Sequence, residues 1–166
     1  MSNLPAVKED VAKTSNEIIQ LVSFELGGEE YGIDVLTVRE IIRMPSITKM
    51  PNTQDYVDGI INLRGIVVPI ISLRRRFGLA DRDIDRQSRI LVMEIGAGLT
   101  GFVVDAVAEV IRISTAEIQP PPTILQGNAA QECVTGVINH ADRLLIALDL
   151  NRMFSAEEKA AFEALE

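Results

Sequence analysis

The chain has 166 residues, of which 47% are hydrophobic and 24% charged, with a formal net charge of −8. This length and composition fit one compact domain or two small ones and exclude disorder along the whole chain. An acidic surface repels phosphate backbones and anionic lipid headgroups, so we expect neither nucleic acid nor a bilayer as a direct partner.

The first 17 residues, MSNLPAVKEDVAKTSNE, are polar and of mixed charge. They lack the apolar core of a signal peptide, and the longest apolar stretches, of about six residues, are far too short to cross a membrane. We therefore expect a flexible N-terminal tail over residues 1–17, no direct membrane insertion and a cytoplasmic location.

The first apolar segments predict short strands joined by turns. IIQLVSFEL at 18–26 is typical of a strand, and Gly27 begins a turn. Residues 29–44 follow as one or two strands with a bend near Leu36. PNTQDYVDG then predicts one helical turn, with Asn52 as its N-cap and Gly59 at its end.

Residues 60–72, IINLRGIVVPIIS, predict a hairpin with its turn near 63–65. Ser72 is placed to cap a short helix, LRRRF, that ends at Gly78. The arginines at 74–76 are a basic run in an acidic protein, and we interpret them as the solvated side of this helix.

The sequence contains an internal repeat, and this repeat defines the expected domain organisation. Residues 20–43 align without a gap on 89–112 at a shift of 69, and residues 56–77 align on 133–154 at a shift of 77. Each copy has about 60 residues, close to the lower limit for an independent core, so the two units should pack together.

The segment GAGLTG at 96–101 has the glycine spacing of a dinucleotide-binding turn. Its counterpart in the first copy, GGEEYG, lacks the middle glycine, and the β-branched residues after Gly101 favour a strand over the helix that such a site requires. We interpret both segments as hairpin turns and expect no nucleotide or other cofactor.

Many short strands with tight turns predict closed sheets, so the expected fold is mainly β, with two small antiparallel barrels packed together. The barrels are expected at 18–79 and 89–154, joined by a charged linker at 80–88, with terminal segments free to cross to the other barrel. A C-terminal helix is expected over 155–166, begun by an S-x-x-E capping box at Ser155.

Positions that differ between the copies are candidates for function. Asn62 recurs as Asn139 and is interpreted as a turn residue. Arg64 becomes Ala141, so the fold does not require it, and it is either an interface residue or a solvated turn arginine. Glu40 recurs as Glu109, three residues before a recurring arginine. The two charges could pair on a helix but would point to opposite faces of a strand.

No catalytic or metal-binding motif accompanies the single cysteine, Cys133, or the single histidine, His140. Cys133 is interpreted as an apolar packing residue, and an enzyme that uses Cys133 with His140 is the alternative from another functional class.

The strings YGID, YVDGIINLRG, VVPI and VVDAVAEV, in this order, closely resemble the CheW family of bacterial chemotaxis coupling proteins over residues 18–158. The resemblance implies two SH3-like five-stranded barrels and a non-catalytic adaptor. Such an adaptor joins chemoreceptor cytoplasmic tips to the histidine kinase CheA in membrane-associated arrays.

The resemblance further implies that the receptor tip docks between the barrels and that the receptor-facing positions are Val38, Glu40, Gly59 and Arg64. The regulatory domain of CheA, which shares the fold, is expected to pair with the protein barrel to barrel. A coupling protein of a CheA-like pathway with another output remains the nearer alternative.

Overall fold

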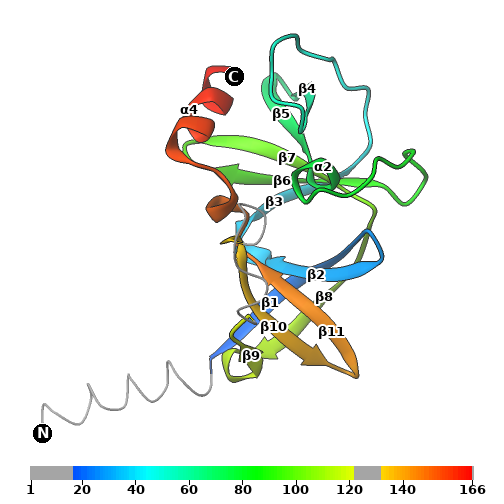
Figure 1. Cartoon of the computed structure of the whole chain (residues 1–166), viewed down its shortest axis with the longest axis vertical. Coiled ribbons are helices and arrows are strands. Elements are labelled where there is room, and N and C mark those ends of the chain that lie inside the picture. The colour runs from blue at the N-terminus through cyan, green and yellow to red at the C-terminus, as the bar shows by residue number, and fades with distance from the viewer. Residues whose placement is uncertain (1–16, 122–131, 166) are drawn as a thin grey trace, which may run out of the picture.

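The computed structural model describes residues 17–121 and 132–165, so nearly all of the tail expected at 1–17 lies outside the described residues. The described chain is mainly β, with two sheets one above the other (Figure 1). The predicted fold class is therefore confirmed.

One sheet, here sheet A, contains β1 (Ile18–Leu26), β2 (Glu29–Asp34), β8 (Ala106–Ser114), β9 (Ile118–Gln119), β10 (Val134–His140) and β11 (Arg143–Leu148). Sheet B contains β3 (Val38–Arg43), β4 (Val57–Leu63), β5 (Ile66–Ser72), β6 (Arg89–Ile95) and β7 (Gly98–Val104). The helical elements are η1 (Val35–Thr37), α2 (Leu73–Arg76), η2 (Thr115–Glu117), η4 (Leu150–Met153) and α4 (Ala156–Leu165). The strand orders are β8-β1-β2-β11-β10-β9 and β3-β6-β7-β5-β4.

The two sequence repeats do not form one sheet each. The first hairpin of each repeat crosses over, so that β1 and β2 join sheet A while β6 and β7 join sheet B. The ranges 18–79 and 89–154 bound the repeats but not the barrels. Because a 60-residue repeat buries little apolar surface alone, this exchange lets each barrel draw its core from both repeats.

Each sheet also contains one parallel pair, where antiparallel barrels were expected. β11 pairs with β2 in sheet A, and β5 pairs with β7 in sheet B. Each of these pairs joins strands of different repeats, which need no hairpin connection between them. The parallel pairs are therefore a direct consequence of the exchange.

The largest apolar core lies between the sheets and includes Phe24 and Ile33 of sheet A with Leu91 and Phe102 of sheet B. Two smaller clusters fill the individual barrels, one around Ile138 in sheet A and the other around the side chains of sheet B. The central core makes the two barrels one body.

Most local predictions are confirmed. GAGLTG forms the turn of the β6–β7 hairpin, in which Ile95 faces Gly98, and residues 63–66 connect β4 to β5. The Ser72 hydroxyl accepts a hydrogen bond from the Arg75 amide at 3.2 Å. Ser155 and Glu158 form the predicted reciprocal capping box.

The helical turn predicted at 52–59 is wrong. Asn52 adopts a left-handed conformation with φ of 60°, and β4 begins at Val57. Tyr56 and Val57 are buried in the central core. Packing of these side chains against the barrel interior overrides the weak local preference for a helix.

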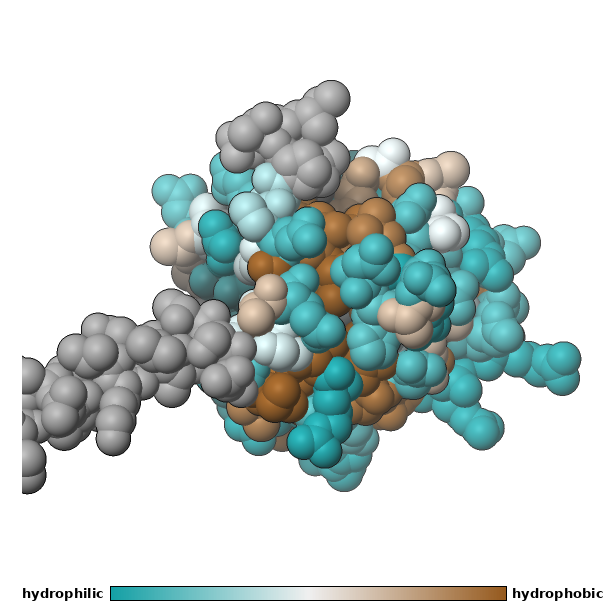
Figure 2. Space-filling view, turned by 90° about the horizontal axis from the view of Figure 1, so that it is seen from below, coloured by the Kyte–Doolittle hydropathy of each residue, from teal (hydrophilic) through white to brown (hydrophobic). Residues whose placement is uncertain are grey.

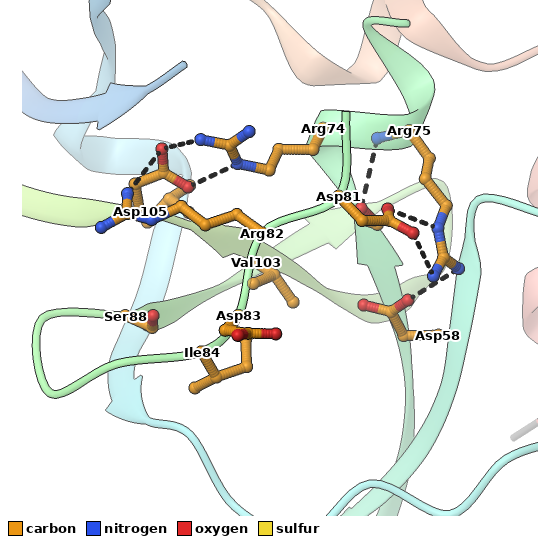
Figure 3. A pocket seen from close by; sticks show the side chains of 12 residues that line it. Asp58, Arg74, Arg75, Asp81, Arg82, Asp83, Ile84, Ser88, Val103 and Asp105 are labelled. Carbon is orange, nitrogen blue, oxygen red and sulfur yellow. Dashed lines mark hydrogen bonds and ion pairs between the residues drawn. The ribbon is translucent and has the colours of Figure 1, made fainter. Parts of the chain in front are cut away.

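The interpretation of residues 74–76 as a solvated helix side is also wrong. Arg75 pairs with Asp58 and Asp81, as Figure 3 shows. The Arg76 guanidinium lies 4.6 Å from the centre of the Tyr56 ring and donates to the Met153 carbonyl at 2.8 Å. Each arginine thus joins α2 to a different part of the chain.

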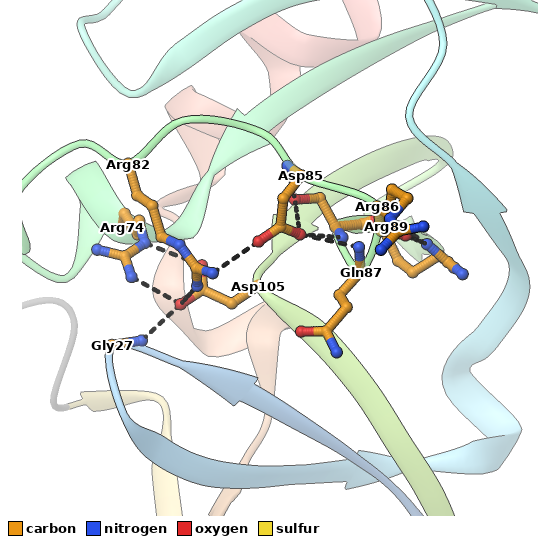
Figure 4. Close-up of polar contacts among 9 residues, drawn as sticks. Gly27, Arg74, Arg82, Asp85, Arg86, Gln87, Arg89 and Asp105 are labelled. Atoms are coloured by element: carbon orange, nitrogen blue, oxygen red, sulfur yellow. Dashed lines mark hydrogen bonds and ion pairs between the residues drawn. The ribbon is translucent and has the colours of Figure 1, made fainter.

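Arg74 takes part in a clasp at the point where the chain crosses from sheet B to sheet A. The crossing residue is Asp105, whose carboxylate accepts hydrogen bonds from Arg74 at 2.9 and 2.6 Å and from the Gly27 amide at 2.9 Å (Figure 4). Arg82 of the linker lies 3.2 Å away. Since Gly27 belongs to sheet A and Arg74 follows sheet B, Asp105 ties the barrels together.

The pseudo-symmetric position carries a weaker version of the clasp. Gly96 and Asn151 are the repeat counterparts of Gly27 and Arg74, and the Gly96 amide lies 3.4 Å from the Asn151 side-chain oxygen. Both contacts join the first hairpin of a repeat to the helix that ends the same repeat. The arrangement therefore follows from the duplication, and the charged clasp is particular to one side.

Asp105→Asn should lower the free energy of unfolding at pH 7 by roughly 2 kcal/mol, because a partly buried charged hydrogen-bond network loses its acceptor charge. Partial burial opposes ionisation of Asp105, but the hydrogen bonds and charges of Arg74, Gly27 and Arg82 lower the pKa of its carboxyl overall. The stabilisation is thus complete above the ordinary aspartate pKa and is lost as pH falls from about 5 through the lowered native value.

Calorimetric melting at pH 7 and pH 3 tests this prediction. The wild-type protein should lose more stability on acidification than Asp105→Asn. The control is Asp83→Asn, an exposed aspartate of the same linker. Equal acid sensitivity of the wild-type protein and Asp105→Asn would contradict the assigned role.

Candidate protein-interaction surface

Glu40 and Arg64 form a bidentate ion pair. Arg64 lies at the tip of the β4–β5 hairpin with φ of 51°, and its Nη1 lies 3.0 Å from Glu40 Oε2, while its Nη2 contacts the other carboxylate oxygen. The hydrogen bond from Arg64 lowers the pKa of the Glu40 carboxyl. The Arg64 side chain is 69% exposed, so the pair presents a fixed, planar guanidinium to solvent.

The pair spans the opening of sheet B, because β3 and β4 are the two edges of its strand order. Below it, the chain after β3 closes the barrel through a bridge between Thr48 and Ile60. Arg64 therefore sits where the two edges meet, and its orientation depends on both.

Val38 begins β3 and packs against the central core while remaining partly exposed. A β-bulge separates it from Glu40 and leaves Arg39 as the extra residue, which pairs with Glu94. Val38 thus links the exposed ion pair to the apolar region between the barrels.

Gly59 is buried and has a structural role. Its φ is 146°, and a Cβ atom there would lie 2.2 Å from the Thr48 carbonyl oxygen, which belongs to the bridge that closes barrel B. At the repeat counterpart, Gly136, a Cβ would also come too close to backbone, 2.8 Å from the Gln119 carbonyl oxygen. The glycine recurs because each barrel closes by a backbone approach that admits no side chain.

Two exposed apolar residues, in the segments that precede Glu40 and follow Arg64, were not identified from the sequence as candidate interface residues. Leu36 of η1 is 87% exposed, and Ile66, two residues after Arg64, is 48% exposed. Their repeat counterparts are Asp105 and Arg143. The comparison of copies that identified Arg64 could therefore have found both residues.

The strand conformation settles the alternatives left open for Glu40, which pairs across the barrel and not with Arg43. In the second copy, Glu109 lies 3.4 Å from Arg143, two positions beyond the counterpart of Arg64. Both barrels therefore brace the same strand with an ion pair. The arginine is supplied from different positions, which explains why the glutamate recurs and the arginine does not.

A hollow of about 330 Å³, lined mostly by sheet A, adjoins Val38 and combines apolar side chains with the carboxylates of Asp34 and Asp149. Its apolar lining includes Ile19, Leu21 and Ile118 of sheet A and Leu150 of η4, and Met93 is the one strand residue from sheet B. Thr37 precedes Val38, and Met93 is the ladder partner of Val38. The hollow and the Glu40–Arg64 pair are thus connected through β3.

Sheet A carries a second set of exposed apolar side chains. Ile18, Val110 and Leu144 are 53%, 53% and 60% exposed. Figure 2, which views the molecule from the sheet A end, shows apolar residues at the centre of that face among hydrophilic ones. Exposed apolar surface with a hydrophilic surround is typical of a protein-binding face.

Cys133 and His140 do not form a pair. Cys133 precedes and His140 ends β10, a seven-residue strand that spans roughly 20 Å. Cys133 is buried, and burial raises the pKa of its thiol to about 12. A thiol in this state is a packing group and not a nucleophile.

Within the described ranges, no helix is long and apolar enough to span a bilayer.

Gly59→Ala should lower the free energy of unfolding by at least about 2 kcal/mol, since the new methyl group would collide with the backbone that closes the barrel. Gly28→Ala is the matched control, because Gly28 also has a positive φ but faces open space. The measurement is denaturant unfolding of both variants. Similar losses in the two would show that backbone strain alone matters at Gly59.

Comparison with known proteins supplies the family. The model of the CheW-like domain matches residues 20–158. The chemotaxis protein CheW of Klebsiella aerogenes is 37% identical over 152 residues, covering 90% of this chain and 91% of that protein. Protein FrzA of Myxococcus xanthus is 33% identical over 115 residues, covering 69% of this chain and 71% of that protein.

The crystal structure of the scaffolding protein TtCheW from Thermoanaerobacter tengcongensis superposes with a TM-score of 0.78 at 37% identity, covering 86% of this chain and 96% of that one. The Klebsiella aerogenes relative is a chemotaxis protein, and the structural neighbour is a scaffolding protein. The chain belongs to the CheW family.

Proposed function

We propose that the protein couples the cytoplasmic tips of chemoreceptors to the regulatory domain of the histidine kinase CheA. The observation that carries this proposal is the partly apolar hollow lined by sheet A and Met93, bordered through Val38 by the exposed Glu40–Arg64 pair. Apolar side chains beside an exposed arginine are enriched at protein-binding hot spots.

The receptor tip is a helical hairpin, and a helix can place its apolar face in such a hollow. In this proposal Arg64 contacts the receptor directly, and Glu40 holds the guanidinium in position. Val38 contributes the apolar border. Gly59 acts indirectly, by keeping the β4–β5 hairpin against the rest of barrel B.

A coupling protein needs a second surface that stays open while the first is occupied. The exposed apolar residues of sheet A lie on the other barrel from Arg64. We assign this face to the CheA regulatory domain, which would pair with it barrel to barrel. Such contacts would hold the protein in membrane-associated receptor arrays through protein partners alone.

The similarity to FrzA supports a second candidate, a coupling protein for a CheA-like pathway with another output. The two candidates share the same surfaces and differ in the receptors and kinase that they join. Binding measured against the receptors and kinases of the source organism distinguishes them.

Arg64→Ala should leave the melting temperature close to that of the wild-type protein, because the second copy builds the same turn with Ala141 at a φ of 52°. Its affinity for a receptor signalling fragment should fall about thirtyfold, as for a central hot-spot arginine. Calorimetric titration beside thermal melting measures both. An unfolded variant, or an unchanged affinity, would refute the assignment of Arg64.

Asn62→Ala is the matched control in the same hairpin. The Asn62 side chain accepts a hydrogen bond from the Gly65 amide at 2.7 Å and so stabilises the turn. This variant should melt at a lower temperature, and its binding should weaken only in proportion to the loss of folded protein.

Leu144→Glu tests the second surface. A charge at this 60% exposed position should weaken binding of the CheA regulatory domain at least about tenfold and leave receptor binding unchanged. Arg64→Ala provides the reciprocal comparison. If Leu144→Glu weakens receptor binding instead, the two surfaces have been assigned the wrong way round.

A further inference from the structure

Most arginines of the described chain pair with a carboxylate, but three that do not are gathered in one place. Arg43, Arg86 and Arg89 line a hollow of about 580 Å³ at the end of sheet B beside the linker. Within residues 17–121 and 132–165, none of these guanidinium groups lies in an ion pair. We call this feature the arginine hollow.

The strand register brings two of these charges together. Arg43 of β3 and Arg89 of β6 are directly opposite in an antiparallel pair, so their side chains leave the sheet on the same face. Like charges in this position destabilise a sheet. The Arg89 guanidinium donates to the carbonyls of Arg86 and Ser88 at 2.8 Å each, which holds it over the linker near Arg86 (Figure 4).

The fold does not require this repulsive contact. By the repeat shift, the counterpart of Arg43 is Arg112 and that of Arg89 is Gln20. Arg112 and Gln20 are opposite one another in the β1–β8 pair, so the second barrel makes the equivalent contact with one charge and not two. The second arginine in barrel B is therefore a feature that folding alone does not explain.

The acid in the hollow does not neutralise it. Asp85 accepts hydrogen bonds from the Gln87 amide at 2.8 Å and from Arg82 at 2.7 Å, and these contacts direct its carboxylate toward its own turn. Three cations and one anion leave a local positive charge in a chain whose net charge is −8.

The hollow also has an apolar part. Met44, the residue after the end of β3, lines the hollow together with Ile84 of the linker, which is 54% exposed. A ligand that fits must therefore combine negative charge with an apolar group. The guanidinium group of arginine suits a carboxylate, because it can donate two parallel hydrogen bonds to the two carboxylate oxygens.

We infer that the arginine hollow binds a short acidic segment of a protein partner, with carboxylates on the three arginines and one apolar side chain against Met44 and Ile84. An extended polyanion is disfavoured, because the charge that it leaves outside the hollow is repelled by a chain of net charge −8. A short peptide can place all its charge within the hollow. The inference does not depend on the receptor and kinase assignments.

The test uses the full chain and a fluorescently labelled peptide of sequence EELEE, with QQLQQ as its uncharged counterpart. Anisotropy titration should show binding of EELEE only, weakening as salt is raised because the contacts are charged and partly exposed. Arg89→Gln, which copies the residue of the other repeat, should weaken binding at least about tenfold while the protein stays folded, because relief of the repulsion by Arg43 offsets the two lost hydrogen bonds.

Arg112→Gln is the matched control, since it removes an unpaired arginine from the equivalent strand of the other barrel. It should leave the affinity for EELEE unchanged. Equal losses in Arg89→Gln and Arg112→Gln would reduce the effect to net charge and overturn the inference. So would equal binding of QQLQQ, full competition by inorganic phosphate at the peptide's own concentration, or preferential capture by phosphatidylglycerol vesicles.

Discussion

The exchange of the first hairpin between repeats is the constraint on which the rest of the structure depends. Each repeat sends its first two strands into the barrel that the other repeat completes, so neither barrel exists without both halves of the chain. The parallel pairs, the central core and the Asp105 clasp all follow from this connectivity. Closure at Gly59 and Gly136 then turns each sheet into a barrel.

For a scaffold, the consequence is a fixed geometry. The hollow beside Val38 is lined by side chains of both sheets, and the Glu40–Arg64 pair depends on both edges of barrel B. A partner that docks there contacts a surface whose shape is set by the packing of the barrels against each other. Binding then costs little conformational entropy, because the surface is already formed before the partner docks.

The sequence predicted the features that depend on neighbouring residues. The hairpin turns, the Ser72 cap and the Ser155 capping box are local, and comparison of the copies separated Asn62 from Arg64. Contacts between distant segments could not be predicted from such local patterns. Arg74 pairs with Asp105, which lies 31 positions later in the sequence. Nothing in a run of three arginines indicates that each of them has a different partner. Asn52 shows the converse, because core packing of the following residues overrode its local preference.

The most direct test of this account is cleavage of the linker. A protease site inserted between Asp83 and Ile84 allows the folded chain to be cut into its two repeats, and size-exclusion chromatography with an amide NMR spectrum reports the result. Because each barrel contains strands of both repeats, the fragments should co-elute as one particle with the spectrum of the intact protein. Separation into two independently folded units would contradict the exchange and the single rigid scaffold that follows from it.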